Sequence, residues 1–190
     1  THSKIAPSDH TLVPMAGAFD ESRWSKLVDS TVVSGGHRFI AGELQIFTHR
    51  GPVLVVARET STDRDISYSV KASVVSGPTQ LGYGLVFGIR DAANYFRFAK
   101  RNSGDYQVME VREGRRLVLV PWTSSQVIKG IQHTQTLEIA TEGPFVTLIV
   151  DGKTLERVKL PRPPVGRVGL AVASPGLTVN FSRVVFGPRR

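Results

Sequence analysis

Aromatic, basic and acidic residues that alternate with apolar ones are the feature of this sequence with the clearest chemical meaning. They occur in four strand-like segments at residues 66–75, 83–90, 94–99 and 106–112. Alternate side chains of a strand point to the same face, so neighbouring segments of this kind build a sheet with one polar face. If the four segments are neighbours, that face carries Ser69, Lys71, Arg90, Tyr95, Arg97, Tyr106, Glu110 and Arg112.

This candidate set supplies what binding of a sugar requires. Its two tyrosines would stack on the C–H face of a sugar ring, its basic residues would donate hydrogen bonds, and Glu110 would accept them. Guanidinium groups pair bidentately with carboxylates and sulfates, so the arginines favour acidic sugars. Trp122 either stands at the rim of this platform or fills the end of the core. An ordinary solvated sheet face without a ligand is the alternative interpretation of the set.

Glu110 is the strongest candidate for a catalytic carboxylate, because we expect it beside Tyr106 and Arg112 on the polar face. Hydrolysis of a glycosidic bond uses two carboxylates, which lie about 5 Å apart in retaining enzymes. A cross-strand ion pair is the alternative role for Glu110. We favour the ion pair over catalysis.

Motifs of other reaction classes do not occur in the sequence. Cysteine is absent, which excludes disulfides, thiolate metal sites and a cysteine nucleophile. The five histidines are scattered without His-x-x-x-His pairing, and there is no Gly-x-Ser-x-Gly nucleophile elbow. The spacing of Gly82, Gly84 and Gly88 is not that of a dinucleotide-binding loop.

The spacing of strands and turns predicts an all-β fold. Residues 66–75 alternate apolar and polar side chains throughout, which indicates an antiparallel sheet with one face in water. Asp151-Gly152 predicts a two-residue hairpin, because both central residues of a type I′ turn need positive φ. About a dozen such short strands predict an antiparallel two-sheet β-sandwich. We expect its core to include the apolar row Tyr83, Leu85, Phe87 and Ile89 in addition to the apolar residues of the segment 66–75.

Length and composition predict one domain without a membrane-spanning segment. The chain has 190 residues, 41% of them hydrophobic, which suits a single β-sandwich over residues 1–190 with residues 1–11 as a loose lead-in. No apolar stretch approaches the roughly 18 residues needed to cross a bilayer. The formal net charge of +8 favours anionic partners. The chain begins without a charged-then-apolar leader, so we expect a mature chain or an excised fragment.

An ordered set of short motifs between Phe19 and Gly187 resembles the concanavalin A-like (laminin G-like) jelly-roll domains of bacterial exported proteins. The resemblance implies two stacked antiparallel sheets, one of them curved, with a concave face that often binds glycans. A shared fold does not establish a shared function. The motifs include Phe19-Asp-x-x-x-Trp24, Gly84-Leu-Val-Phe87, Asp91-x-x-Asn94-Tyr-Phe96, Gly104-x-Tyr106, Leu119-x-x-Trp122, Val146-x-Leu-x-Val-Asp-Gly152, Gly166-x-Val-Gly-Leu170 and Val179-x-Phe181.

Enzymes of the same superfamily carry motifs that this sequence lacks. The Glu-x-Asp-x-x-Glu strand of the β-glucanase branch is absent, and no Glu-x-Gln follows Asn102-Ser103-Gly104 as in keto-disaccharide hydrolase-like domains. Laminin G-like members often hold calcium, for which Asp91 with Asn94 is the candidate here. Two oxygen donors fall short of the six to eight that calcium prefers, so we expect no resident cofactor, with calcium as the alternative.

Together these observations predict a non-catalytic carbohydrate-binding or adhesive module that acts outside the cytoplasm, in a secreted, periplasmic or cell-surface setting. Its partner would be a glycan, with an acidic polysaccharide as one candidate. The alternatives are a glycan-cleaving hydrolase on the same scaffold and a structural domain without a ligand. Nucleic acid is not the expected partner, because no recognisable RNA-binding motif accompanies the aromatic and basic residues.

Overall fold

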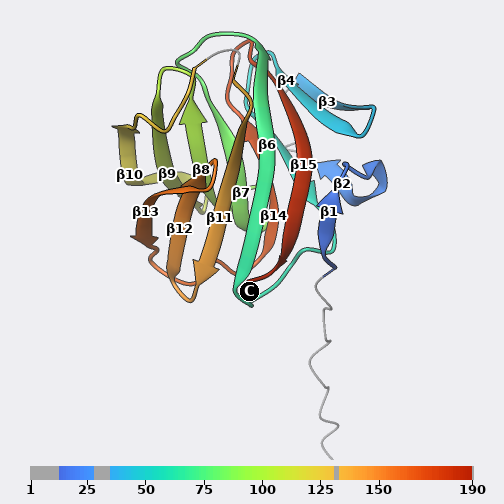
Figure 1. Ribbon diagram of the computed structural model, residues 1–190. Helices are drawn as coiled ribbons and strands as arrows, with labels where there is room; N and C mark the ends of the chain where they lie inside the picture. The colour runs from blue at the N-terminus through green and yellow to red at the C-terminus, as the bar shows by residue number, and fades with distance from the viewer. Residues whose placement is uncertain (1–12, 28–34, 131–132, 190) are drawn as a thin grey trace, which may run out of the picture.

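The computed structural model describes residues 13–27, 35–130 and 133–189, and these residues form two antiparallel sheets packed face to face (Figure 1). The predicted lead-in at residues 1–11 lies outside the described residues. The only helix in the described part is η1, a single 3-10 turn at Glu21–Arg23. No helix there has the length and hydropathy needed to cross a membrane.

Sheet A, as we name the first sheet, lies in front in Figure 1, and sheet B lies behind it. Sheet A has the order β13 (Lys153–Lys159), β12 (Phe145–Val150), β11 (Gln135–Glu142), β6 (Ile66–Ser76), β15 (Thr178–Pro188), β4 (Glu43–Thr48) and β3 (Gly35–Ile40), and β1 (Met15–Gly17) pairs with β15. Sheet B has the order β10 (Arg115–Ser124), β9 (Asp105–Arg112), β8 (Asn94–Arg101), β7 (Gly82–Asp91), β14 (Arg167–Val172), β5 (Val53–Ala57) and β2 (Trp24–Lys26). The predicted all-β, antiparallel two-sheet sandwich is therefore confirmed.

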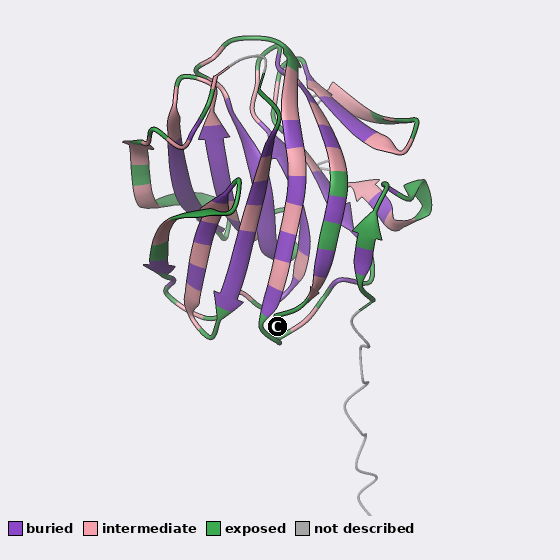
Figure 2. Ribbon diagram, in the orientation of Figure 1, coloured by how far each residue is buried: buried purple, intermediate pink, exposed green. Residues whose placement is uncertain are grey.

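The core lies between the two sheets and is built from the inward side chains of each strand. Figure 2 shows the alternation along β6, where buried and half-buried residues succeed one another. Tyr68 of β6 is fully buried, packs against Phe186 at 6.3 Å between ring centroids, and donates its hydroxyl to the Gly169 carbonyl. The predicted hairpin between β12 and β13 also forms, with φ of 50° at Asp151 and 76° at Gly152.

The strand β6 is not a neighbour of β7, β8 and β9, which corrects the assumption of one continuous sheet. It pairs with β11 and β15 in sheet A, whereas β7 pairs with β8 and β14 in sheet B. After β6 the chain crosses from one sheet to the other. Both β6 and β7 therefore bury their apolar sides in the same core from opposite directions, and their polar sides face opposite sides of the molecule.

A bulge at Gly88 moves Ile89 out of the core row predicted for it. The register between β7 and β8 shifts between Phe87 and Asp91, and Gly88 has a φ of 57°. A Cβ at Gly88 would lie 3.1 Å from atoms of Phe96 and Pro164, so the position suits glycine. Because the bulge adds a residue, Ile89 packs with apolar residues on the outer side of sheet B.

Candidate functional site

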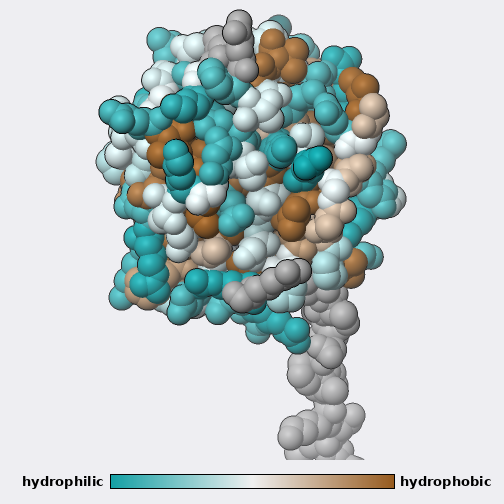
Figure 3. Space-filling model, in the orientation of Figure 1, coloured by the Kyte–Doolittle hydropathy of each residue, from teal (hydrophilic) through white to brown (hydrophobic). Residues whose placement is uncertain are grey.

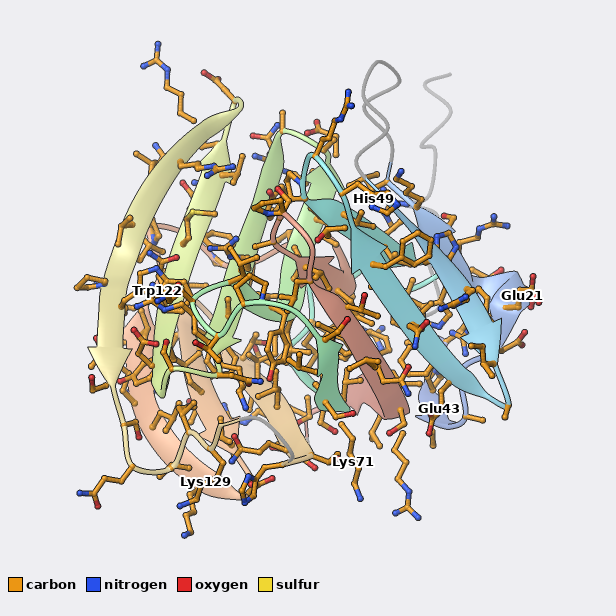
Figure 4. The ribbon with its side chains drawn as sticks, turned by 90° about the horizontal axis from the view of Figure 1, so that it is seen from above. Glu21, Glu43, His49, Lys71, Trp122 and Lys129 are labelled. Atoms are coloured by element: carbon orange, nitrogen blue, oxygen red, sulfur yellow. The ribbon has the colours of Figure 1, made fainter. Side chains whose placement is uncertain are left out.

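The structure distributes the predicted binding set over the outer side of sheet B, the outer side of sheet A and the side of β9 that faces the core. Tyr95 and Arg97 lie together on the outer side of sheet B, since they alternate with the core residues Phe96 and Phe98. Lys71 lies on the outer side of sheet A, and in Figure 4 it projects from the lower edge of the view, away from the yellow-green strands. The prediction that the whole set shares one face is therefore wrong.

Tyr106 faces the space between the sheets and is not available as a stacking surface. It is 5% exposed and packs edge-on against Phe98 at 6.4 Å between ring centroids. Its hydroxyl donates to Glu156 Oε1 at 3.0 Å. Burial, together with this hydrogen bond, raises the pKa of Tyr106 to about 12. Its role in this conformation is to join β9 of sheet B to β13 of sheet A.

Glu110 also lies on the inner side of β9 and is completely enclosed. Its Oε1 accepts from Arg112 Nε at 2.6 Å, and Arg162 Nη2 lies 2.9 Å from Oε2. The Arg162 guanidinium also sits 5.5 Å from the centre of the Phe96 ring. The ion pair favoured from the sequence is thus present, although its partners come from the same strand and from a loop. A carboxylate enclosed between two guanidiniums is not presented to a sugar.

The outer side of sheet B differs from an ordinary solvated sheet face. Val86 is fully buried, Val56 is 2% exposed and Met109 is 4% exposed, although all three point away from the core between the sheets. Small residues face outward beside them, including Gly84 and Ala99, which are paired across β7 and β8. We call this side the outer face of sheet B, defined by Tyr95, Arg97, Ala99 and Arg101 of β8, Gln107 and Met109 of β9, and Trp122 of β10.

Arg97 is the central polar residue of the outer face of sheet B. Its Nη2 donates to Gln107 Oε1 at 2.9 Å, while its Nε is buried without a hydrogen-bond partner among the described residues. No carboxylate in the described part of the chain forms a salt bridge with it. Burial lowers the pKa of Arg97, and the positive charge of Arg116 adds to this effect while Tyr95 opposes it. A buried N–H group without an acceptor is costly, so the enclosed Nε of this half-buried arginine favours a partner that supplies one.

Trp122 stands on the same face and not in the core, which decides between its two predicted positions. A Cβ at Gly82 would lie 2.9 Å from its ring, so the tryptophan covers that glycine. The guanidinium of Arg101 lies 4.0 Å from the centre of the indole ring and also binds Asp105. Tyr95 and Arg101 are six residues apart on β8, or roughly 20 Å at the rise of a strand. Aromatic rings therefore lie near both ends of the face, with Arg97 between them.

A hollow of about 250 Å³ adjoins the outer face at the turn between β7 and β8. Tyr95 belongs to both, so the face and the hollow are continuous. We call this cavity the end hollow, and its lining consists of Gly88, Arg90, Asn94, Tyr95, Phe96, Arg162, Pro163 and Val165.

Asp91 and Asn94, the calcium candidates, hold the turn beside the end hollow. Asp91 Oδ1 accepts from Asn94 Nδ2 at 2.9 Å and from the Ala93 N–H at 2.8 Å, and these bonds lower the pKa of Asp91. Asn94 Oδ1 accepts from the Glu113 N–H at 3.1 Å. The described residues contain no group of three or more potential metal-binding histidine or carboxylate side chains. This arrangement offers fewer oxygens than calcium uses, and calcium binding stays a prediction.

Sequence reasoning missed Gln107, Arg101 and Arg162 as members of this region. Gln107 lies on the same side of β9 as Met109. It belongs to the outer face because it pairs with Ala99 of β8. A run of small outward residues at Gly82, Gly84 and Ala99 is the signal that could have marked this face. Arg162 lies in a proline-rich connection without periodicity, and no local pattern indicates where its side chain goes.

Comparison with known proteins adds evidence on the fold. No protein-family model and no curated protein match the sequence. Among solved structures, the carbohydrate-binding module CBM66 from Bacillus subtilis is similar with a TM-score of 0.72 and 16% identity, over 86% of this chain and 94% of that one. A native glycosidic hydrolase has a TM-score of 0.67 and 12% identity, over 95% and 98% of the two chains.

A third similar structure is the exoplasmic/lumenal domain of VIP36 in a Ca²⁺- and Man3GlcNAc-bound form. Its TM-score is 0.64 with 12% identity, over 97% of this chain and 90% of that one. These proteins support the jelly-roll β-sandwich and are consistent with the predicted concanavalin A-like fold. The same scaffold serves a sugar-binding module and a hydrolase, so the likeness alone does not choose between these activities.

Proposed function

We propose that this protein is a non-catalytic carbohydrate-binding or adhesive module that binds a glycan on the outer face of sheet B. The observation that carries the proposal is Arg97, a half-buried arginine whose Nε is enclosed without a hydrogen-bond partner and which forms no salt bridge with a carboxylate among the described residues. A purely structural role would leave the buried Nε without an acceptor. A ligand rich in hydroxyl or acidic groups would supply the missing acceptors.

The layout of the face suits an extended glycan lying along β8. Tyr95 and Trp122 provide aromatic surface near its two ends, and Arg97 and Gln107 provide hydrogen-bonding groups between them. Aromatic rings carry much of the binding energy of such sites, because they bury apolar area at a small cost in entropy.

The state of Glu110 favours binding over cleavage. Both of its oxygens face arginines and its side chain is inaccessible to solvent. A glycosidase needs a pair of carboxylates that reach the scissile bond. We place the module outside the cytoplasm, as a secreted, periplasmic or cell-surface protein, because extended glycans are abundant there.

The proposal is tested by screening the full chain against immobilised glycans and titrating the strongest hit by calorimetry. Arg97→Met, which keeps the bulk of the side chain, should weaken binding at least tenfold, since a hydrogen bond to a charged group contributes about 1.5–3 kcal/mol. The same variant should keep or raise the melting temperature, because it removes a buried N–H group without an acceptor and a partly desolvated charge.

Lys71→Ala is the matched control, because it removes a positive charge from the outer side of sheet A. It should leave the affinity unchanged. An array without binding at low salt would instead support a ligand-free structural domain. Cleavage of the glycan that is abolished in Glu110→Ala would support a hydrolase.

A further inference from the structure

The end hollow has an arginine-rich lining that the proposed glycan platform does not require. Two arginines line it: Arg90, near the end of β7, and Arg162, in the connection before β14. Arg90 forms no salt bridge with a carboxylate among the described residues. The hollow therefore presents a guanidinium that forms no salt bridge in the described part of the chain, although the exposed carboxylate of Asp91 next to it interacts with its charge.

Arg162 is held in the wall by groups that leave part of its guanidinium unused. Glu110 divides its two oxygens between Arg112 and Arg162, so neither arginine receives the bidentate pairing that satisfies a guanidinium best. The contact of Arg162 with Oε2 lacks hydrogen-bonding geometry. Phe96 supports the same guanidinium from below at 5.5 Å. Glu110 is thus a positioning residue that sets Arg162 beside the cavity.

Positive charge exceeds negative charge around the hollow. Tyr95, at its junction with the outer face, is close enough to Arg97 and Arg116 for their charges to act on its pKa, which burial raises and they lower. Asp91 is exposed and already accepts two hydrogen bonds within its own turn. The arginines of the region are Arg90, Arg97, Arg112, Arg116 and Arg162, and the carboxylates are Asp91, Glu110 and Glu113.

The size of the hollow limits what it can hold. Its volume of about 250 Å³ is below the range of about 300–1,000 Å³ that is typical of pockets for drug-sized ligands. One sugar unit fits such a space, whereas a longer segment would have to leave over the outer face. Pro163 and Val165 close the hollow on the side of the connection before β14.

We propose that the end hollow binds the terminal unit of an acidic glycan, with its carboxylate or sulfate between Arg90 and Arg162 and its ring against Tyr95. This inference rests on the proposed function, because the remainder of the glycan would lie along β8. It assigns the ligand a chemical class and a direction along β8. The terminal sugar of the glycan is anionic and lies in the end hollow, and the following units lie over Arg97.

The test compares glycans that differ only in their last unit. Uronic acid-terminated, sialic acid-terminated and sulfate-terminated oligosaccharides are titrated against the full chain, each beside its carboxyl-reduced or desulfated counterpart. We expect the acidic members to bind at least tenfold more tightly, with a preference that falls as salt rises from 50 to 500 mM. The carboxylate and sulfate arms show which anion is preferred.

Two variants assign that preference to the hollow. Arg90→Ala removes an exposed side chain and should reduce the acidic-to-neutral ratio at least fivefold, with neutral binding retained. Arg162→Lys keeps a charge for Glu110 but loses the planar fork, and should also lower the ratio. Arg183→Ala, which removes an exposed side chain from β15 of sheet A, is the arginine control and should leave the ratio unchanged.

The outcomes separate the two proposals. Equal affinity for acidic and neutral members, or a preference that survives both variants, overturns the end hollow while the glycan platform stands. Equal binding of glycans whose acidic unit is internal overturns the terminal placement. Loss of all binding in Arg97→Met, with the ratio unaffected in Arg90→Ala, likewise supports the platform alone. If no glycan binds at any salt concentration, both proposals are wrong.

Discussion

The outer sides of the two sheets share a sequence pattern but differ in physical character. On sheet A, β6 presents Ser67, Ser69, Lys71 and Ser73, which are half-buried and regularly spaced. Figure 3 shows this side as a mixture of hydrophilic and neutral side chains with scattered apolar ones. On sheet B, the outward residues are small or apolar and largely enclosed, and Arg97 lies among them. A solvated face accommodates a polar residue at little cost, whereas a charge among enclosed residues needs a partner that offsets its desolvation.

The largest expected difference between the two sides is in how much stability a substitution on each side costs. A Cβ at Gly84 would lie 2.2 Å from the Phe98 carbonyl oxygen, so Gly84→Ala forces the backbone of sheet B to move. We expect it to lower the free energy of unfolding by about 2–4 kcal/mol. Ser69→Ala, on the outer side of sheet A, should change it by less than about 0.5 kcal/mol. Urea denaturation measures both, and equal effects would show that the two sides are packed alike.

Two cations on β8, one half-buried and one fully buried, sharpen the comparison. Lys100 points into the core and is fully buried, but its Nζ donates to Gln135 Oε1 at 2.7 Å and to the Lys129 carbonyl at 3.3 Å. It also lies 5.6 Å from the centre of the Tyr83 ring. Lys100 is therefore satisfied by the protein itself, whereas the Nε of Arg97 finds no partner among the described residues. Contacts within the protein explain the position of Lys100, whereas we propose that a ligand pairs with Arg97.

The titration of Lys100 gives the next largest effect. Burial lowers its pKa from 10.5 to about 8, although the charge of Asp151 opposes the shift. The unfolded chain then binds more protons than the folded chain between these two pH values, so stability rises with pH in that window. We expect the wild type to gain about 1–2 kcal/mol between pH 8 and 9.5 relative to Lys100→Met. Parallel slopes of unfolding free energy against pH would contradict the assignment.

The smallest effect compares two aromatic residues that each carry a stacked arginine. Arg101 lies 4.0 Å from the Trp122 ring on sheet B, and Arg157 lies 3.9 Å from the Phe145 ring on sheet A. Trp122→Ala should weaken binding of the screened glycan about three- to tenfold, because it removes one aromatic end of the platform. Phe145→Ala should leave binding unchanged in the same calorimetric titration. If both variants bind like the wild type, the platform does not extend to Trp122.

Local alternation predicted the strands and the turn at Asp151-Gly152, because both depend on neighbouring residues and their φ angles. It could not assign β6 and β7 to different sheets, since a strand with one apolar side fits either half of a sandwich. For the same reason Lys71 was grouped with Tyr95. Ile89 was misplaced because the bulge at Gly88 reverses the alternation after it.

The candidate site was partly predictable for similar reasons. Tyr95 and Arg97 were grouped correctly because they share one side of a regular strand. Tyr106 and Glu110 were placed on that side as well, but on β9 the other alternate set faces outward. Choosing between the two sets needs the partner strand, because Tyr106, Val108 and Glu110 alternate as cleanly as Gln107 and Met109. The contribution of Arg162 depends on a contact across the fold with Glu110 that no local pattern encodes.

Backbone amide chemical-shift mapping with the strongest glycan hit tests the central claim most directly. The account predicts shifts that concentrate on residues 95–101 of β8, on Gln107 and on Trp122, with residues 67–73 of β6 unaffected. Shifts that concentrate on β6 and leave β8 unchanged would contradict it.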